Sequence, residues 1–155
     1  MVIDINRVEI LLVEDNGQDI ELALYALRRE KLANHIEVAR DGEEALDFLF
    51  CRGRFADRNM GEQPRLVLLD LKLPKVDGLE VLRQVKGDPR TKAIPIVIMT
   101  SSREERDMVN GYKLGVNAYI QKPVDFDEFR RMVNQIGLFW MVVNQAPPAS
   151  AFSAD

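Results

Sequence analysis

Polar residues of four kinds follow apolar segments in this sequence, and together these residue types suit phosphate chemistry. The residues in question are Glu14 and Asp15, Asp70, Thr100, and Lys122. Asp70 comes directly after the apolar run 66–69, which is typical of a strand buried on both faces. An aspartate carboxylate can attack phosphorus and form an acyl phosphate. We therefore expect Asp70 to act as a nucleophile toward a phosphoryl group.

The acidic residues also indicate a metal ion. Glu14, Asp15 and Asp70 could stay ionised side by side only if a cation neutralised them. Mg²⁺ prefers hard oxygen ligands and keeps several waters while it bridges a carboxylate and a phosphate. Asp15 and Asp70 are expected to bind the ion directly, and the longer Glu14 through water. Each acid taken singly could instead form a turn or cap a helix.

Lys122 and Thr100 could contact the phosphoryl group from other sides. Lys122 would add a compact positive charge, and Pro123 after it fixes where the lysine points, through a bond that can be cis. The alternative is an ordinary exposed lysine. The Thr100 hydroxyl could bond a phosphoryl oxygen, or it could cap the charged helix that begins near residue 103.

Five apolar segments alternate with five segments of helical periodicity, which predicts a parallel sheet with helices on both faces and right-handed crossovers. The expected strands are 8–13, 35–39, 66–69, 94–99 and 118–120. In such sheets, ligands bind outside the carboxyl ends of the strands. If the first and third strands are neighbours, with the fourth and fifth beyond the third, the polar groups share one crevice.

Two other segments have less regular patterns. The polar connection 51–64 is either a recognition loop or a passive insertion. In the helix that ends at Gly115, we expect Met108, Val109 and Tyr112 to face inward.

Length and composition restrict the function classes. A chain of 155 residues fits one domain, and we expect residues 1–145 to form it and 146–155 to be a disordered tail. The net charge of -4 without a cationic run favours neither nucleic acid nor a membrane surface. The apolar run 138–143 is too short to span a bilayer. One cysteine, Cys51, and the lack of a signal-peptide pattern predict a cytoplasmic location.

Taken in order and spacing, these residues resemble the receiver domain of two-component response regulators, over residues 8–136. The resemblance is carried by Glu14-Asp15, Asp70, Leu73-Pro74, Asp77-Gly78, Thr100 and Lys122-Pro123. It implies a flavodoxin-like, doubly wound α/β fold with a five-stranded parallel sheet in the order 2-1-3-4-5 and five helices.

The resemblance also implies roles for individual residues. Asp70 would accept a phosphoryl group from a phosphohistidine on a sensor histidine kinase. The Mg²⁺ ligands would be Asp15, Asp70 and the backbone carbonyl of Lys72, with Glu14 in the outer position. Thr100 and Tyr119 would form a switch pair, and Lys122 would contact the phosphoryl group. Such a protein would catalyse only its own phosphorylation and slow dephosphorylation, so it would not be an enzyme in the ordinary sense.

A subgroup is also indicated, that of the single-domain response regulators associated with phytochromes. The 51–64 loop, residues 73–75 and Phe139-Trp140 resemble it, and it implies a light-regulated bacteriophytochrome kinase as donor. It also implies a homodimer through the last helix and the adjoining face of the fourth helix, fifth strand and fifth helix. Residues 136–143 are apolar almost all round, which favours an isologous contact through Phe139, Trp140 and Val143.

Three other functions agree less well with the sequence. A haloacid-dehalogenase-type phosphatase also uses an Asp nucleophile and magnesium, but it needs a second Asp where Lys72 stands. In a flavin-binding protein of the same fold, Glu14 and Asp15 would repel the flavin phosphate. A degenerate receiver would be expected to lack Asp15, Asp70 or Lys122, and all three are present.

Overall fold

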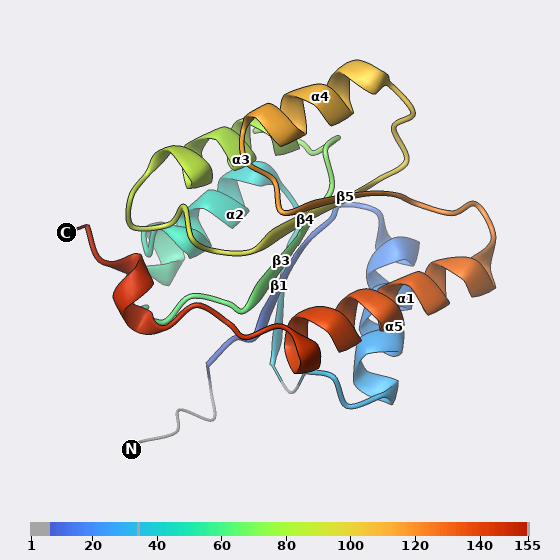
Figure 1. Cartoon of the computed structure of the whole chain (residues 1–155), viewed down its shortest axis with the longest axis horizontal. Helices are drawn as coiled ribbons and strands as arrows, with labels where there is room; N and C mark the ends of the chain where they lie inside the picture. The colour runs from blue at the N-terminus through green and yellow to red at the C-terminus, as the bar shows by residue number, and fades with distance from the viewer. Residues whose placement is uncertain (1–6, 34, 155) are drawn as a thin grey trace.

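The computed structural model describes residues 7–33 and 35–154 and contains one five-stranded parallel sheet in the order β2-β1-β3-β4-β5 (Figure 1). The predicted strand order is therefore confirmed. The strands are β1 (Ile10–Val13), β2 (Ile36–Ala39), β3 (Leu66–Leu69), β4 (Ile96–Thr100) and β5 (Ala118–Gln121). The three central strands β1, β3 and β4 are buried along their whole length, which explains their nearly continuous apolar sequences.

Helices cover both faces of the sheet. On one face lie α1 (Gly17–Arg29) and α5 (Phe126–Leu138), which pack against each other, and on the other lie α2 (Gly42–Leu49), α3 (Gly78–Gly87) and α4 (Glu105–Lys113) (Figure 1). Alternate strand residues divide between the two cores. In β1, for example, Leu11 and Val13 belong to the core with α2 and α3, whereas Ile10 and Leu12 belong to the core with α1 and α5.

The helices begin close to the ends of the strands, which brings their first turns to the carboxyl edge of the sheet. Four of them have an N-cap side chain that accepts a hydrogen bond from the backbone N–H three residues later. The capping residues are Asn16, Asp41, Asp77 and Asp125. Asp77 thus takes the capping role before α3 and leaves Asp70 without one.

The residues of α4 that were predicted to face inward are exposed in the structure. Met108, Val109 and Tyr112 are 45%, 42% and 53% exposed, and the helix's single buried residue is Gly111. A β-carbon added at Gly111 would lie 3.3 Å from Ile98 Cδ1 and 3.5 Å from Tyr119 Cδ2. The helix therefore approaches the sheet through its glycine, and its apolar side chains remain at the surface.

The C-terminal segment also differs from the prediction. α5 continues into a π-helical turn, η2 (Phe139–Val143), and a 3₁₀ helix, η3 (Ala149–Phe152), follows. Phe152 is only 5% exposed and belongs to the core on the α2 and α3 side. Figure 1 shows the red segment leaving α5 and crossing to that side. The prediction of a disordered tail over 146–155 overlooked Phe152, whose burial gives the segment a fixed place; residue 155 itself lies outside the described residues.

The 51–64 connection is packed against α2. It contains a short 3₁₀ helix, η1 (Gly53–Phe55). Phe55 packs edge-on against Phe48, with ring centroids 5.0 Å apart, and the Arg58 guanidinium lies 3.6 Å from the centroid of the same Phe48 ring. Arg58 also donates hydrogen bonds to the backbone carbonyls of Phe48 and Glu62. These contacts hold the connection on the domain.

Within the described ranges, none of the helices combines the length and the apolar character needed to cross a membrane.

Candidate functional site

The ends of β1 and β3 bring three carboxylates together. β1 and β3 are paired from Ile10 and Leu66 onward, and the Asp70 N–H donates to the Val13 carbonyl at 3.0 Å. Glu14, Asp15 and Asp70 each offer an oxygen within 4.8 Å of the others. Glu14 and Asp70 are buried, whereas Asp15 is exposed. The predicted acidic cluster is therefore present.

Lys122 enters this cluster from β5. Its backbone N–H donates to the Thr100 carbonyl at 2.7 Å, which aligns the ends of β4 and β5. Its ammonium lies 2.6 Å from Glu14 Oε2 and 3.0 Å from Asp70 Oδ2, with a side chain only 8% exposed. Lys122 is therefore not an ordinary surface lysine. The Lys122–Pro123 bond is trans, since the described residues contain no cis peptide bond.

A third carboxylate, Asp19 in the first turn of α1, also contacts Lys122. Its Oδ2 lies 2.9 Å from the ammonium. Sequence reasoning missed this residue because an acid in the first turn of a helix is ordinary and favourable there. Its distance of 103 residues from Lys122 leaves no local pattern that could have revealed the pair.

Burial and charge set the protonation of the cluster. Burial raises the pKa of Glu14 to about 7, and the nearby Asp70 charge adds to this effect, while the hydrogen bond from Lys122 opposes it. Burial alone would lower the pKa of Lys122, but the bonds to Asp19 and Glu14 outweigh it and hold this pKa above its usual value. The ammonium therefore stays charged.

The donor set fits a hard divalent cation. The carboxylates of Glu14, Asp19 and Asp70 contact one ammonium, and Asp15 lies beside Glu14 and Asp70. The excess of negative charge, part of it buried, is unfavourable without a further cation. Oxygen ligands at this spacing are the kind that small divalent ions bind.

The two expected switch residues lie on the neighbouring strands β4 and β5. Thr100 ends β4 and is fully buried, and its Oγ1 accepts a hydrogen bond from the Ser102 N–H at 3.2 Å. Ser102 in turn donates from Oγ to Asp107 Oδ2 at 2.6 Å, which connects Thr100 to the first turns of α4. No pattern in the sequence distinguishes Ser102 or Asp107 from other polar residues near a helix start.

Tyr119 lies on β5 with its ring against Gly111 of α4. Its hydroxyl is buried and makes no hydrogen bond of ordinary geometry with any residue that the structure describes. Burial raises the pKa of this hydroxyl, and the negative charge of Asp107 raises it further. The neighbouring Ser102 side chain partly opposes this rise in the pKa.

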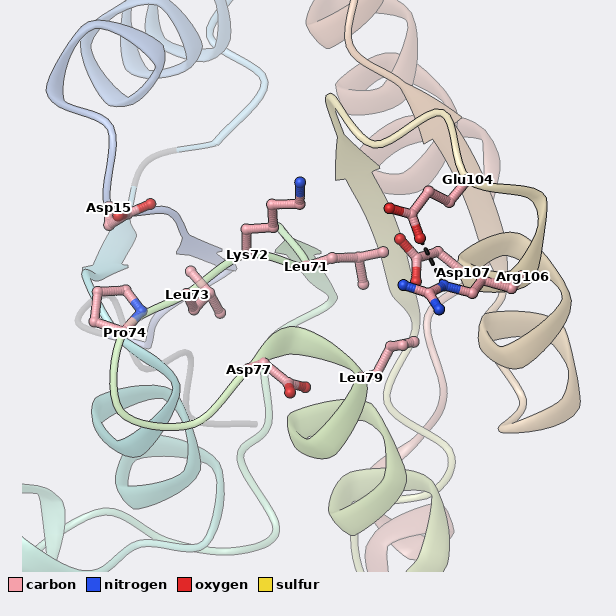
Figure 2. Close-up of a pocket in the computed structure, with 10 residues that line it drawn as sticks. All are labelled: Asp15, Leu71, Lys72, Leu73, Pro74, Asp77, Leu79, Glu104, Arg106 and Asp107. Carbon is pink, nitrogen blue, oxygen red and sulfur yellow. Dashed lines mark hydrogen bonds and ion pairs between the residues drawn. The ribbon is translucent and has the colours of Figure 1, made fainter.

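An open groove of about 410 Å³ runs from the acidic cluster toward α4. Figure 2 shows Asp15, Lys72 and Asp77 on one side of it and Glu104, Arg106 and Asp107 on the other. The backbone at Gly78 passes close to Asp70, because a β-carbon at Gly78 would lie 2.2 Å from the Asp70 carbonyl oxygen. Glycine is therefore required at the start of α3.

Comparison with known proteins places the fold and the cluster in one family. The sequence profile of the response regulator receiver domain matches residues 10–134. This chain belongs to that family. Response regulator receivers are signalling proteins and not enzymes in the ordinary sense. Membership of this family makes the chain a phosphoacceptor of a two-component system.

Two curated relatives match nearly the whole receiver. The probable methanogenesis regulatory protein FilR2 of Methanothrix harundinacea is 43% identical over 138 residues, which cover 89% of this chain and 86% of that protein. Response regulator Rcp1 of Synechocystis is 38% identical over 140 residues, which cover 90% of this chain and 93% of Rcp1. One solved structure of Rcp1 is the Mn²⁺-bound form. It has a TM-score of 0.84 and 37% identity, and the match covers 90% of this chain and 99% of that one.

Two further solved structures relate this receiver to phytochrome response regulators. The phosphorylated cyanobacterial phytochrome response regulator RcpA superposes with a TM-score of 0.85 at 39% identity, covering 91% of this chain and 99% of that one. The bacteriophytochrome response regulator AtBRR has a TM-score of 0.69 at 54% identity, and the match covers 89% of this chain and 98% of AtBRR.

Proposed function

We propose that this receiver accepts a phosphoryl group on Asp70 from a sensor histidine kinase, with Mg²⁺ bound beside it. The observation that carries the proposal is the contact of Lys122 with Asp70 at 3.0 Å inside a cluster of carboxylates from β1 and β3. The proposed Mg²⁺ ligands are Asp15, Asp70 and the backbone carbonyl of Lys72, with Glu14 in the outer position. The Mn²⁺-bound form of Rcp1 supports a divalent ion in this family.

The residues of the cluster have separate parts in the transfer. An Asp70 carboxylate oxygen forms a bond to phosphorus as the bond from phosphorus to the donor nitrogen breaks, and the donor keeps that electron pair. Asp70 is held by the Leu71 N–H, which donates to Oδ1 at 2.7 Å. Bound Mg²⁺ would supply neutralisation of the phosphoryl oxygens. Lys122 supplies a second positive charge next to the reacting carboxylate.

We propose that Thr100 and Tyr119 report the modification. The new phosphoryl oxygens offer the Thr100 hydroxyl a stronger acceptor, and Thr100 would then release the Ser102 N–H that it now binds. Because Ser102 also bonds Asp107, this change reaches the first turns of α4. Tyr119 lies between α4 and the sheet and would move with them.

The kinase and the location are proposed from the relatives and the composition. The likeness to phytochrome response regulators supports a bacteriophytochrome-type histidine kinase as donor. A cytoplasmic site of action agrees with a single cysteine, Cys51, that cannot form an internal disulfide.

The test is phosphoryl uptake from acetyl phosphate. With Mg²⁺, intact mass measurement should show one added phosphoryl group on the wild-type chain, and a chelator should abolish the uptake because the carboxylates then lack their cation. The controls are one sample with acetyl phosphate alone and one sample with the chelator alone. Uptake that persists undiminished after chelation would contradict the metal assignment, and absence of uptake with Mg²⁺ would contradict the function.

We also propose a homodimer through the C-terminal helix and the face of α4, β5 and α5. Phe139 and Val143 are 47% and 62% exposed, and α4 also carries exposed apolar residues. Trp140 is half-buried and packs edge-on against Phe139, with ring centroids 5.1 Å apart. Exposed aromatic residues of this kind are typical of interfaces.

Removing either aromatic side chain should weaken the dimer. Phe139→Ala and Trp140→Ala are each expected to lower the apparent mass measured by light scattering, because each removes apolar area from the contact. Tyr25→Ala is the matched control, since Tyr25 is an exposed aromatic residue of α1, which is not part of the proposed interface. If the two aromatic variants keep the mass of the wild type at every concentration tested, the interface is elsewhere or absent.

A further inference from the structure

The Lys122 ammonium is held by three carboxylates, and one of them stands outside the acidic cluster proposed to bind the metal. Glu14 and Asp70 belong to that cluster, whereas Asp19 does not. An ammonium has three N–H donors, and the three oxygens at 2.6, 2.9 and 3.0 Å use all of them. Asp19 is therefore the one partner of Lys122 that belongs neither to the proposed metal site nor to the proposed phosphoacceptor.

The position of Asp19 is itself well fixed. The residue lies in the first turn of α1, where its N–H donates to the Asn16 Oδ1 cap at 3.1 Å. Its side chain is 25% exposed, in contrast to 1% for Glu14. An acid at a helix start needs no partner to be favourable. A contact at 2.9 Å with a lysine that is itself buried, 103 residues away, is more than this placement requires.

We propose that Asp19 is a positioning residue that keeps the Lys122 ammonium facing Asp70 while the charges on its other two partners change. This inference rests on the proposed function of Asp70. When Asp70 becomes an acyl phosphate, its carboxylate charge is lost and the new negative oxygens lie farther from the strand end. Without Asp19, Lys122 would be drawn toward Glu14, its nearest partner, and away from the phosphoryl group.

The first experiment measures the initial rate of phosphoryl uptake from acetyl phosphate at saturating Mg²⁺. Asp19→Ala should lower this rate about tenfold, because a misplaced catalytic group costs at least that much. Asp19→Asn should stay close to the wild-type rate, since its side-chain oxygen still accepts from the ammonium. Glu21→Ala is the matched control, because Glu21 is an exposed acid on the same helix.

A double-mutant cycle separates positioning from a general loss of charge or helix stability. In a Lys122→Met background, Asp19→Ala should cause no further loss of rate, because the residue through which Asp19 acts is gone. If Asp19→Ala slows uptake by the same factor with and without Lys122, or not at all in the wild-type background, the inference is overturned and the function of Asp70 is unaffected.

The second experiment does not depend on phosphorylation. Heteronuclear NMR of the lysine ammonium groups, in the metal-free protein, should show a slowly exchanging Lys122 signal in the wild type and in Asp19→Asn. The signal should broaden or shift in Asp19→Ala and remain unchanged in Glu21→Ala. If the wild type takes up no phosphoryl group, the proposed function fails and this measurement alone decides the contact. A Lys122 signal that is indifferent to Asp19→Ala rejects the positioning role.

Discussion

Replacing Asp70 with asparagine is expected to abolish phosphoryl uptake. The amide retains the shape of the side chain, and its single oxygen can accept from either the Leu71 N–H or Lys122, which bind different oxygens of Asp70. It is not a nucleophile toward phosphorus. The rate of uptake from acetyl phosphate should fall by at least about a hundredfold, which is typical when a nucleophile is removed. Intact mass after incubation with acetyl phosphate and Mg²⁺ measures the effect.

The matched control for this variant is Asp77→Asn. Asp77 lines the same groove and caps α3, and asparagine is an equally good N-cap. This control should therefore take up a phosphoryl group as the wild type does. Asp70→Asn should also keep its fold, because it removes one negative charge from a crowded cluster. Equal labelling of Asp70→Asn and the wild type would show that another residue is the acceptor.

Replacing Lys122 with methionine is expected to destabilise the metal-free protein by about 3 kcal/mol, because it leaves buried carboxylates without their counter-charge. Glu14 and Asp70 are the carboxylates concerned, at 1% and 9% side-chain exposure. Mg²⁺ should restore part of the loss, so that the ion stabilises the variant more than the wild type. Urea unfolding with and without Mg²⁺ measures both free energies.

The loss should also depend on pH. The pKa of Glu14 is raised to about 7 from a usual 4.5, so the folded state binds more protons than the unfolded state between these values. Stability from this group therefore falls as pH rises through that window, and removal of Lys122 makes the ionised form still less favourable. The variant should be more destabilised at pH 8 than at pH 6.

The matched control for the lysine is Lys92→Met, since the Lys92 side chain is exposed. It should change the free energy of unfolding by less than about 0.5 kcal/mol. A Lys122→Met protein as stable as Lys92→Met in the absence of Mg²⁺ would mean that the acidic cluster does not need the ammonium.

The sheet and most of the cluster could be predicted because they depend on local patterns. Apolar runs such as 66–69 identify buried strands, and parallel strands place the residues after them at one edge. Asp19 could not be predicted in this way, because its partner is remote in sequence and its helix-start position is ordinary. The tertiary fold, in which α1 packs against α5, brings the two together.

Two further differences arose from packing that periodicity does not encode. In α4, the spacing of Met108 and Tyr112 suits a buried face, yet Gly111 allows the backbone to approach the sheet and turns that face outward. In the C-terminal segment, residues 146–155 were expected to be disordered, whereas Phe152 packs into the core.

Because α4 contacts the sheet through Gly111, its packing affects how far a local structural change can spread. Gly111 removes almost no apolar surface from water, so α4 gains little of the hydrophobic stabilisation that holds α1, with four buried residues, against the sheet. A reorientation of α4 would therefore cost far less free energy than the unfolding of the domain. The sheet and α1 can stay rigid as a base while the one weakly attached helix takes up a second arrangement.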